Sequence, residues 1–125
     1  MNANAIGDRA AEYVLNGITR LQKLPRHEGA AWYERLNSDT LNQASSEKDV
    51  LGQLFGGYWQ GLIALGFVTE DERARFEDTT LNYYPRGITE AAHCGFALGD
   101  EFMTWDALNA EWKRQIAILR KAARN

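Results

Sequence analysis

The chain contains few of the residues from which metal sites and thiol chemistry are built. Its 125 residues include one cysteine, Cys94, and two histidines, His27 and His93. One cysteine excludes a disulfide within the chain, and no group of cysteines and histidines has the spacing of a zinc site. The sequence therefore predicts no metal ion, no cofactor and a reducing compartment.

Signals for export and for membrane insertion are also absent. The first residues, MNANAIGDRAAEY, contain no basic segment followed by an apolar run, as a secretory signal would. The most apolar stretch, residues 50–67, is interrupted by Gln53, Gln60 and five glycines. A membrane span needs about 20 predominantly apolar residues in a row. We expect a cytoplasmic protein that makes no contact with a membrane.

Motifs typical of enzymes are missing as well. The glycine-rich stretch is not followed by the Lys-Ser/Thr pair of a phosphate-binding loop, and no serine has the GxSxG context of a hydrolase. His93 and Cys94 are neighbours, and on a helix neighbouring side chains diverge by about 100°, which disfavours a thiol–imidazole pair. The sequence identifies no catalytic residue, so an enzyme of unrecognised type ranks third among the possible functions.

Negative charge is concentrated in the middle of the chain. The formal net charge is −3, and residues 38–82 hold eight acidic but only three basic residues. Because affinity for nucleic acid comes largely from neutralised phosphates, this balance argues against direct nucleic-acid binding. The densest carboxylate group comprises Glu70, Asp71, Glu72, Glu77 and Asp78. It is either a solvated helix start, favoured by the helix dipole, or a decoy surface that inhibits a host nucleic-acid enzyme.

The strongest structural pattern lies in residues 50–66, VLGQLFGGYWQGLIALG. At about 100° per residue, its large apolar side chains fall on one face of a helix. Gly52 and Gly56 are one turn apart and lack side chains, so we expect another helix to cross closely at these two positions. Such packing would offset the cost of glycine in a helix, about 1 kcal/mol each. Ser46 is expected to cap the start of this helix and a left-handed Gly66 its end.

Five further helical segments are predicted, and residues 95–103 allow one short strand. The segments cover residues 8–23, 29–37, 69 to 76 or 77, 89–95, and 100 or 104 to the end of the chain. In the last of them the large apolar residues fall within an arc of about 80° at helical spacing. These residues are Trp105, Leu108, Trp112, Ile116 and Leu119. We predict an all-α fold: one domain over residues 1–125 with five or six helices, the glycine-containing helix packed centrally against the amphipathic C-terminal helix.

Two surface segments have the composition of a protein-binding site. The sequence NYYPRG places Tyr83, Tyr84 and Arg86 around a stiffening proline, and tyrosine and arginine are enriched at binding hot spots. The alternative is that the tyrosines fold back onto the core. The last helix aligns three basic residues as a docking strip for an acidic partner or as a solvated helix end that complements the dipole. These are Lys113, Arg120 and Arg124.

The glycine-rich stretch and a later segment also carry a resemblance. LGQLFGGYWQGLIALGF, followed by CGFALGDEFMTWDALNAEWKRQI, resembles small uncharacterised bacterial and phage-associated proteins with the pattern LGQxFGxYxxGLxALG, a GF segment and a closing helix. The resemblance implies a phage or mobile-element setting and transfers no catalytic residue. The sequence as a whole predicts a small non-enzymatic interaction module that binds an unidentified protein or forms a homodimer.

Overall fold

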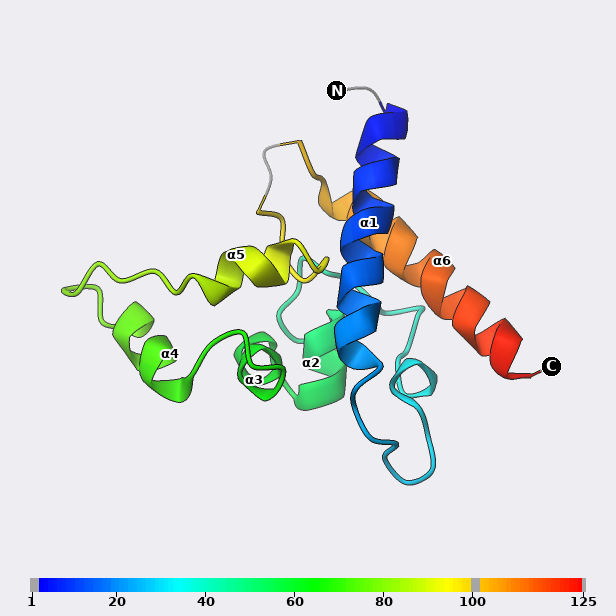
Figure 1. Cartoon of the computed structure of the whole chain (residues 1–125), viewed down its shortest axis with the longest axis horizontal. Helices are drawn as coiled ribbons and strands as arrows, with labels where there is room; N and C mark the ends of the chain where they lie inside the picture. The colour runs from blue at the N-terminus through cyan, green and yellow to red at the C-terminus, as the bar shows by residue number, and fades with distance from the viewer. Residues whose placement is uncertain (1–2, 100–101, 125) are drawn as a thin grey trace.

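The structure is a computed structural model that describes residues 3–99 and 102–124. These residues form six α-helices and one short 3-10 helix, with no strand among them, so the predicted all-α class is confirmed (Figure 1). In chain order the elements are α1 (Ala3–Leu21), η1 (Trp32–Glu34), α2 (Val50–Phe55), α3 (Tyr58–Ala64), α4 (Glu70–Glu77), α5 (Gly87–Ala92) and α6 (Trp105–Ala123). None of these helices combines the length and apolarity that crossing a bilayer requires.

The centre of the molecule is the contact between its two longest helices, α1 and α6. Trp112 of α6 is fully buried, and its indole Nε1 donates a hydrogen bond to the Gly95 carbonyl at 2.8 Å. The Phe96 ring stacks on Trp112 with centroids 5.5 Å apart. The predicted packing of the glycine-containing helix against α6 was wrong, because the elements that pack on α6 are α1 and η1.

The predicted helix over residues 50–66 is broken in two. Gly56 adopts a left-handed conformation, with φ of 87°, and ends α2, while the extended Gly57 precedes α3. Gly66 adopts the predicted left-handed conformation after α3, with φ of 82°. There the Phe67 N–H donates to the Leu62 carbonyl at 2.9 Å, which is the long bond of a Schellman motif.

The close helix crossing expected at Gly52 and Gly56 was also wrong. A Cβ atom on Gly52 would lie 2.5 Å from the Ser46 carbonyl oxygen, in the loop before α2, and one on Gly56 would meet nothing within 4 Å. The close approach lies instead at Gly17 of α1, where a Cβ atom would come within 2.1 Å of the Cys94 carbonyl oxygen. Gly17 therefore lets the segment after α5 pack directly on the α1 backbone.

The shorter elements differ from prediction mainly at their ends. The helix expected over residues 29–37 is reduced to η1, although Trp32 and Leu36 are buried as its spacing indicated. Asp49, not Ser46, caps α2. The Thr69 capping box of α4 and a Thr104 cap on α6 are confirmed.

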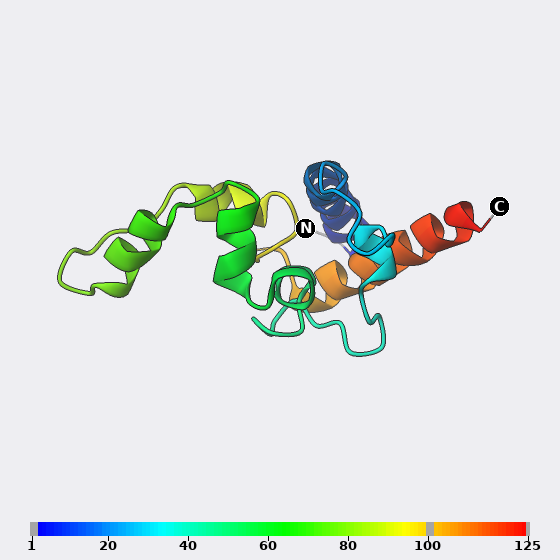
Figure 2. The ribbon, with the colours of Figure 1, turned by 90° about the horizontal axis from the view of Figure 1, so that it is seen from below.

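Residues 69–86 form an arm that leads away from α1 and α6. Figures 1 and 2 both place α4 and the segment after it at one end of the molecule and the C-terminus at the other. No residue of α4 is buried. Pro85, at the end of the arm, is fully buried, but the rest of the arm depends on contacts within itself and with α3.

The Gly17 contact leads to a stability prediction. Gly17→Ala improves helix propensity by about 1 kcal/mol, yet we expect a net loss of about 1–3 kcal/mol because the added methyl group displaces the Cys94 backbone. Gly7→Ala is the matched control, because it lies in the same helix with nothing within 4 Å of the new methyl group. Urea denaturation measures both variants, and equal stabilisation of the two would contradict the close contact.

Candidate functional site

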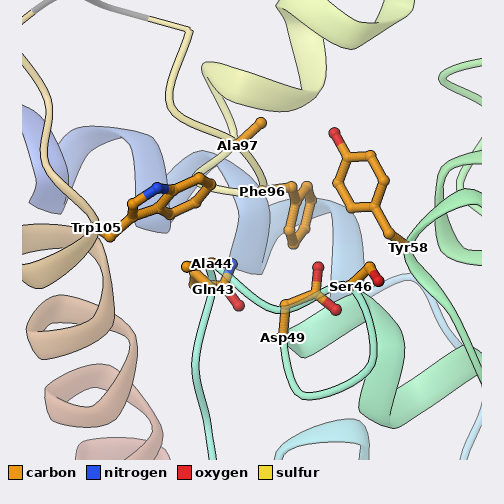
Figure 3. A pocket seen from close by; sticks show the side chains of 8 residues that line it. All are labelled: Gln43, Ala44, Ser46, Asp49, Tyr58, Phe96, Ala97 and Trp105. Carbon is orange, nitrogen blue, oxygen red and sulfur yellow. The ribbon is translucent and has the colours of Figure 1, made fainter.

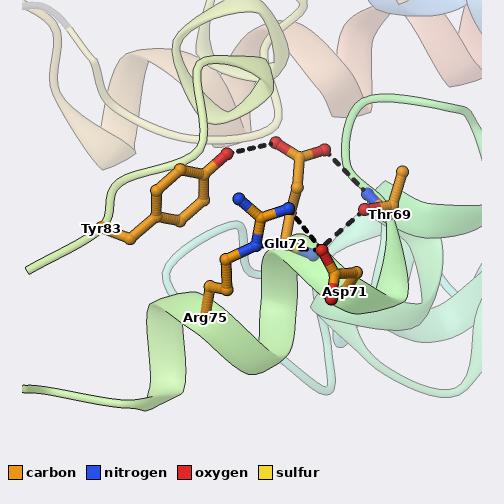
Figure 4. A network of polar contacts seen from close by, with 5 residues as sticks. All are labelled: Thr69, Asp71, Glu72, Arg75 and Tyr83. Carbon is orange, nitrogen blue, oxygen red and sulfur yellow. Dashed lines mark hydrogen bonds and ion pairs between the residues drawn. The ribbon is translucent and has the colours of Figure 1, made fainter. Parts of the chain in front are cut away.

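Tyr83 folds back onto the arm and not onto the hydrophobic core. Its hydroxyl donates a hydrogen bond to Glu72 Oε2 at 2.9 Å, and the Arg75 guanidinium lies over its ring, 5.1 Å from the centroid (Figure 4). The hydrogen bond to Glu72 raises the pKa of Tyr83. Tyr83 therefore joins α4 to the returning segment, while its neighbour Tyr84 points outward with 60% of its surface exposed.

Most carboxylates of the predicted decoy surface are engaged by other groups of the arm. Asp71 pairs with Arg75 and Glu77 pairs with Arg73, each one helical turn away. The other two engaged acids bond hydroxyl groups: Glu72 contacts Tyr83, and Asp78 accepts hydrogen bonds from Thr80 that lower its pKa. Glu70 is the one member of this group that bonds no other side chain among the described residues. The arm thus uses its acids to hold its own conformation.

Aromatic rings line one side of the arm in a continuous series. The Trp59 and Phe76 ring centroids are 5.2 Å apart, and those of Phe76 and Tyr84 are 5.9 Å apart. The Arg73 guanidinium covers the Trp59 ring at 5.8 Å. We call Trp59, Phe76 and Tyr84 the aromatic ladder. Sequence reasoning missed the first two, although Phe76 is the one large apolar residue of α4 and could have been singled out for that reason.

The exposed surface of the ladder continues at the tip of the arm. Phe76 is 37% exposed, and Leu81, in the turn after α4, is 53% exposed. Arg86 is exposed at the base of the arm. Phe76 is partly covered by the Trp59 and Tyr84 rings, and its remaining surface, like that of Leu81, is exposed to solvent.

The basic strip predicted on α6 is not continuous. Arg120 is half-buried and donates hydrogen bonds to the carbonyls of Tyr33 and Leu36, which ties α6 to the segment around η1. Lys113 and Arg124 are exposed. The central residue of the predicted strip therefore serves the fold, and a role of the strip in partner binding stays a prediction.

A cavity of about 220 Å³ lies beside α3 and is mostly apolar, and its wall residue Tyr58 contacts the Trp59 ring of the ladder with centroids 6.1 Å apart. Figure 3 shows side chains from the loop before α2, from α3, from the segment after α5 and from the start of α6 around this space. The lining residues are Gln43, Ala44, Ser46, Asp49, Tyr58, Phe96, Ala97 and Trp105. Segments that are far apart in the sequence thus meet here.

Asp49 is the chemically unusual group of this cavity. It is only 1% exposed, and its Oδ1 accepts the Gly52 N–H at 2.5 Å as the cap of α2. Removal from water raises the pKa of Asp49 to about 7, and the backbone hydrogen bonds only partly oppose this rise. Burial also raises the pKa of Tyr58 to about 12, with a smaller contribution from Asp49. A carboxyl group that titrates near neutrality therefore faces aromatic rings.

The loop that carries Asp49 is held by a buried amide. Gln43 donates from Nε2 to the Gly95 carbonyl at 2.9 Å and accepts the Val50 N–H at 2.8 Å. The Gln43 N–H in turn donates to Asn109 of α6 at 2.6 Å. One glutamine therefore connects the start of α2, the segment after α5 and α6, and fixes the position of Asp49.

The adjacent His93 and Cys94 do not form a nucleophilic pair. Cys94 is buried, and desolvation raises the pKa of its thiol. The His93 ring packs against Tyr13 with centroids 5.3 Å apart. Within residues 3–99 and 102–124, no group of three or more His, Cys, Asp or Glu side chains is placed to hold a metal ion.

Comparisons with protein families, curated proteins and solved structures find no match to this chain. The resemblance to phage-associated proteins therefore stays a prediction. Any function must therefore be inferred from the geometry of the arm and of the Asp49 cavity.

The raised pKa of Asp49 predicts how stability depends on pH. The folded protein retains this proton to about pH 7, whereas the unfolded chain loses it near the ordinary value of 3.8, so stability falls as pH rises through this window. Asp49→Asn keeps the capping oxygen and removes the titration. We therefore expect the free energy of unfolding of Asp49→Asn, measured relative to that of wild type, to increase by about 2–3 kcal/mol from about pH 5 to about pH 8.

Urea denaturation at the two pH values measures this gain. The exposed Asp39→Asn is the control, and it should keep the wild-type pH dependence. Identical pH dependence in wild type, Asp39→Asn and Asp49→Asn would show that Asp49 does not titrate near neutrality.

The burial of Cys94 predicts its reactivity. Alkylation needs an accessible thiolate, so iodoacetamide at neutral pH should label the native thiol at least about tenfold more slowly than the thiol of the chain unfolded in guanidinium. Mass spectrometry follows both reactions. Equal rates in the two states would refute the structural role of this cysteine.

Proposed function

We propose that the protein is a small non-enzymatic protein-binding module whose contact surface is the aromatic ladder and the tip of the arm. The observation that carries this proposal is the exposure of Phe76 and Tyr84 on an arm that its own polar contacts hold in place. Leu81 and Arg86, elsewhere on the arm, are also exposed. Tyrosine, tryptophan and arginine are the residue types that most often dominate binding energy.

The stiffness of the arm favours binding. A helix as short as α4 is marginal in isolation, because isolated helices of fewer than about 12–15 residues rarely persist in water. Here the Thr69 capping box, the two ion pairs and the contact of Tyr83 with Glu72 hold it in one conformation. Less conformational freedom is then lost on docking, so more of the contact energy contributes to affinity.

The decoy alternative has less support. A decoy needs carboxylates that are free to face a basic groove, whereas Asp71 and Glu77 are already paired within the arm. The enzyme alternative rests on the Asp49 cavity alone, whose lining among the described residues includes the Ser46 and Tyr58 hydroxyl groups but no histidine, cysteine, lysine or second carboxyl group.

The test is a double substitution on the ladder. The protein captures a partner from an extract of its native host, and the purified partner is then titrated against wild type and against Phe76→Ala/Tyr84→Ala. We expect the variant to keep its helical circular dichroism and to bind at least about tenfold more weakly, or about 1.4 kcal/mol. If the partner is a second copy, sedimentation at increasing concentration replaces the titration.

The control removes equally exposed apolar groups elsewhere. Leu15→Ala/Ile118→Ala, on α1 and α6, should bind like wild type. Normal binding by the ladder variant would refute the proposal. If Glu70→Gln/Asp71→Asn/Glu72→Gln then lost binding with a steep salt dependence, the decoy function would take its place.

A further inference from the structure

The walls of the Asp49 cavity combine aromatic rings with a carboxyl group, and the proposed binding function does not involve them. Three aromatic side chains, Tyr58, Phe96 and Trp105, stand around it, and the Asp49 carboxyl group lies at its floor (Figure 3). The four residues come from four separate segments of the chain. Because these segments meet only in the folded state, the cavity is a product of the tertiary structure.

Asp49 lacks the cation that a buried carboxylate normally has. No lysine, arginine or histidine among the described residues forms an ion pair with it, and no basic residue lines the cavity. Buried charges in proteins are usually paired or bound to a cation, because an unpaired buried charge is costly. Without a cation from the chain, Asp49 keeps its proton to about pH 7, and a cation bound from outside would favour its ionised form.

We propose that this cavity binds an alkylammonium group. The ammonium N–H groups would donate charge-assisted hydrogen bonds to the Asp49 carboxylate. The adjacent carbon atoms would lie against the faces of Tyr58, Phe96 and Trp105, which attract cations through their ring quadrupoles. This inference does not depend on the aromatic ladder.

The size and charge of the cavity narrow the ligand class. Its volume of about 220 Å³ lies below the range of about 300–1,000 Å³ that is usual for drug-sized ligands, so it suits a group of a few carbon atoms. An anion would be repelled by Asp49, and a neutral alcohol would leave the carboxylate unpaired. A free amine and the side chain of a lysine carry the same ammonium group.

The test is a titration with small probes. n-Butylammonium, which matches the end of a lysine side chain, and doubly blocked lysine (Nα-acetyl-lysine-N-methylamide) are titrated at neutral pH by calorimetry. Amide chemical shifts in nuclear magnetic resonance locate the site. Binding of butylammonium alone would identify a free amine as the source, and binding of blocked lysine would identify a lysine side chain. Butyrate and n-butanol should bind at least about tenfold more weakly than butylammonium.

Two substitutions test the walls of the cavity. Asp49→Asn keeps the cap of α2 and removes the charge, so we expect at least about tenfold weaker binding of butylammonium, with the exposed Asp39→Asn as an unaffected control. Trp105→Leu should weaken binding several-fold by removing one aromatic face. Phe76→Leu alters the ladder outside the cavity and should retain full affinity.

Three binding results would overturn the inference. They are the absence of butylammonium binding to wild type at millimolar concentrations, equal binding of butanol, and undiminished binding to Asp49→Asn. Shifts mapped away from residues 43–49, 58, 96–97 and 105 would have the same meaning. A failure of this site leaves the ladder proposal intact, because the Phe76→Ala/Tyr84→Ala experiment measures a different surface.

Discussion

The packing of Trp112 between α1 and the segment after α5 is the contact on which the rest of the structure depends. The indole fills the centre of the core, bonds the Gly95 carbonyl and stacks on Phe96. The approach is possible because Gly17 presents bare backbone to the Cys94 carbonyl. Close-packed interiors tolerate little added volume, so this crossing sets where the segment after α5 runs and therefore where Phe96 meets the cavity.

The loop before α2 completes the cavity beside that core. Gln43 satisfies backbone groups of two segments, and its own N–H is bound by Asn109, so the loop cannot move independently of α6. Fully satisfied buried polar networks of this kind specify one arrangement. The cost is the burial of Asp49, whose raised pKa is the measurable consequence.

The interactions that stabilise the arm differ from those of the core. It is held by ion pairs, a capping box and ring contacts at the surface, and it leaves Phe76 and Tyr84 in contact with water. Surface ion pairs contribute little stability each, so the arm depends on the combined effect of its capping box, ion pairs and ring contacts. Tyr58 lines the cavity and Trp59 belongs to the ladder, so one short helix supports both candidate surfaces.

The sequence by itself determined the features that depend on neighbouring residues. The all-α class, the amphipathic α6 and the capped α4 follow from helical periodicity and from Thr69 and Glu72 at the required spacing. Only the tertiary structure decided where the glycine stretch breaks, which glycine allows a close contact and which tyrosine stays exposed. It also placed Asp49 among aromatic rings. These outcomes depend on contacts between distant segments, such as Gln43 with Gly95 across 52 residues, and a local pattern carries no information about which segments meet.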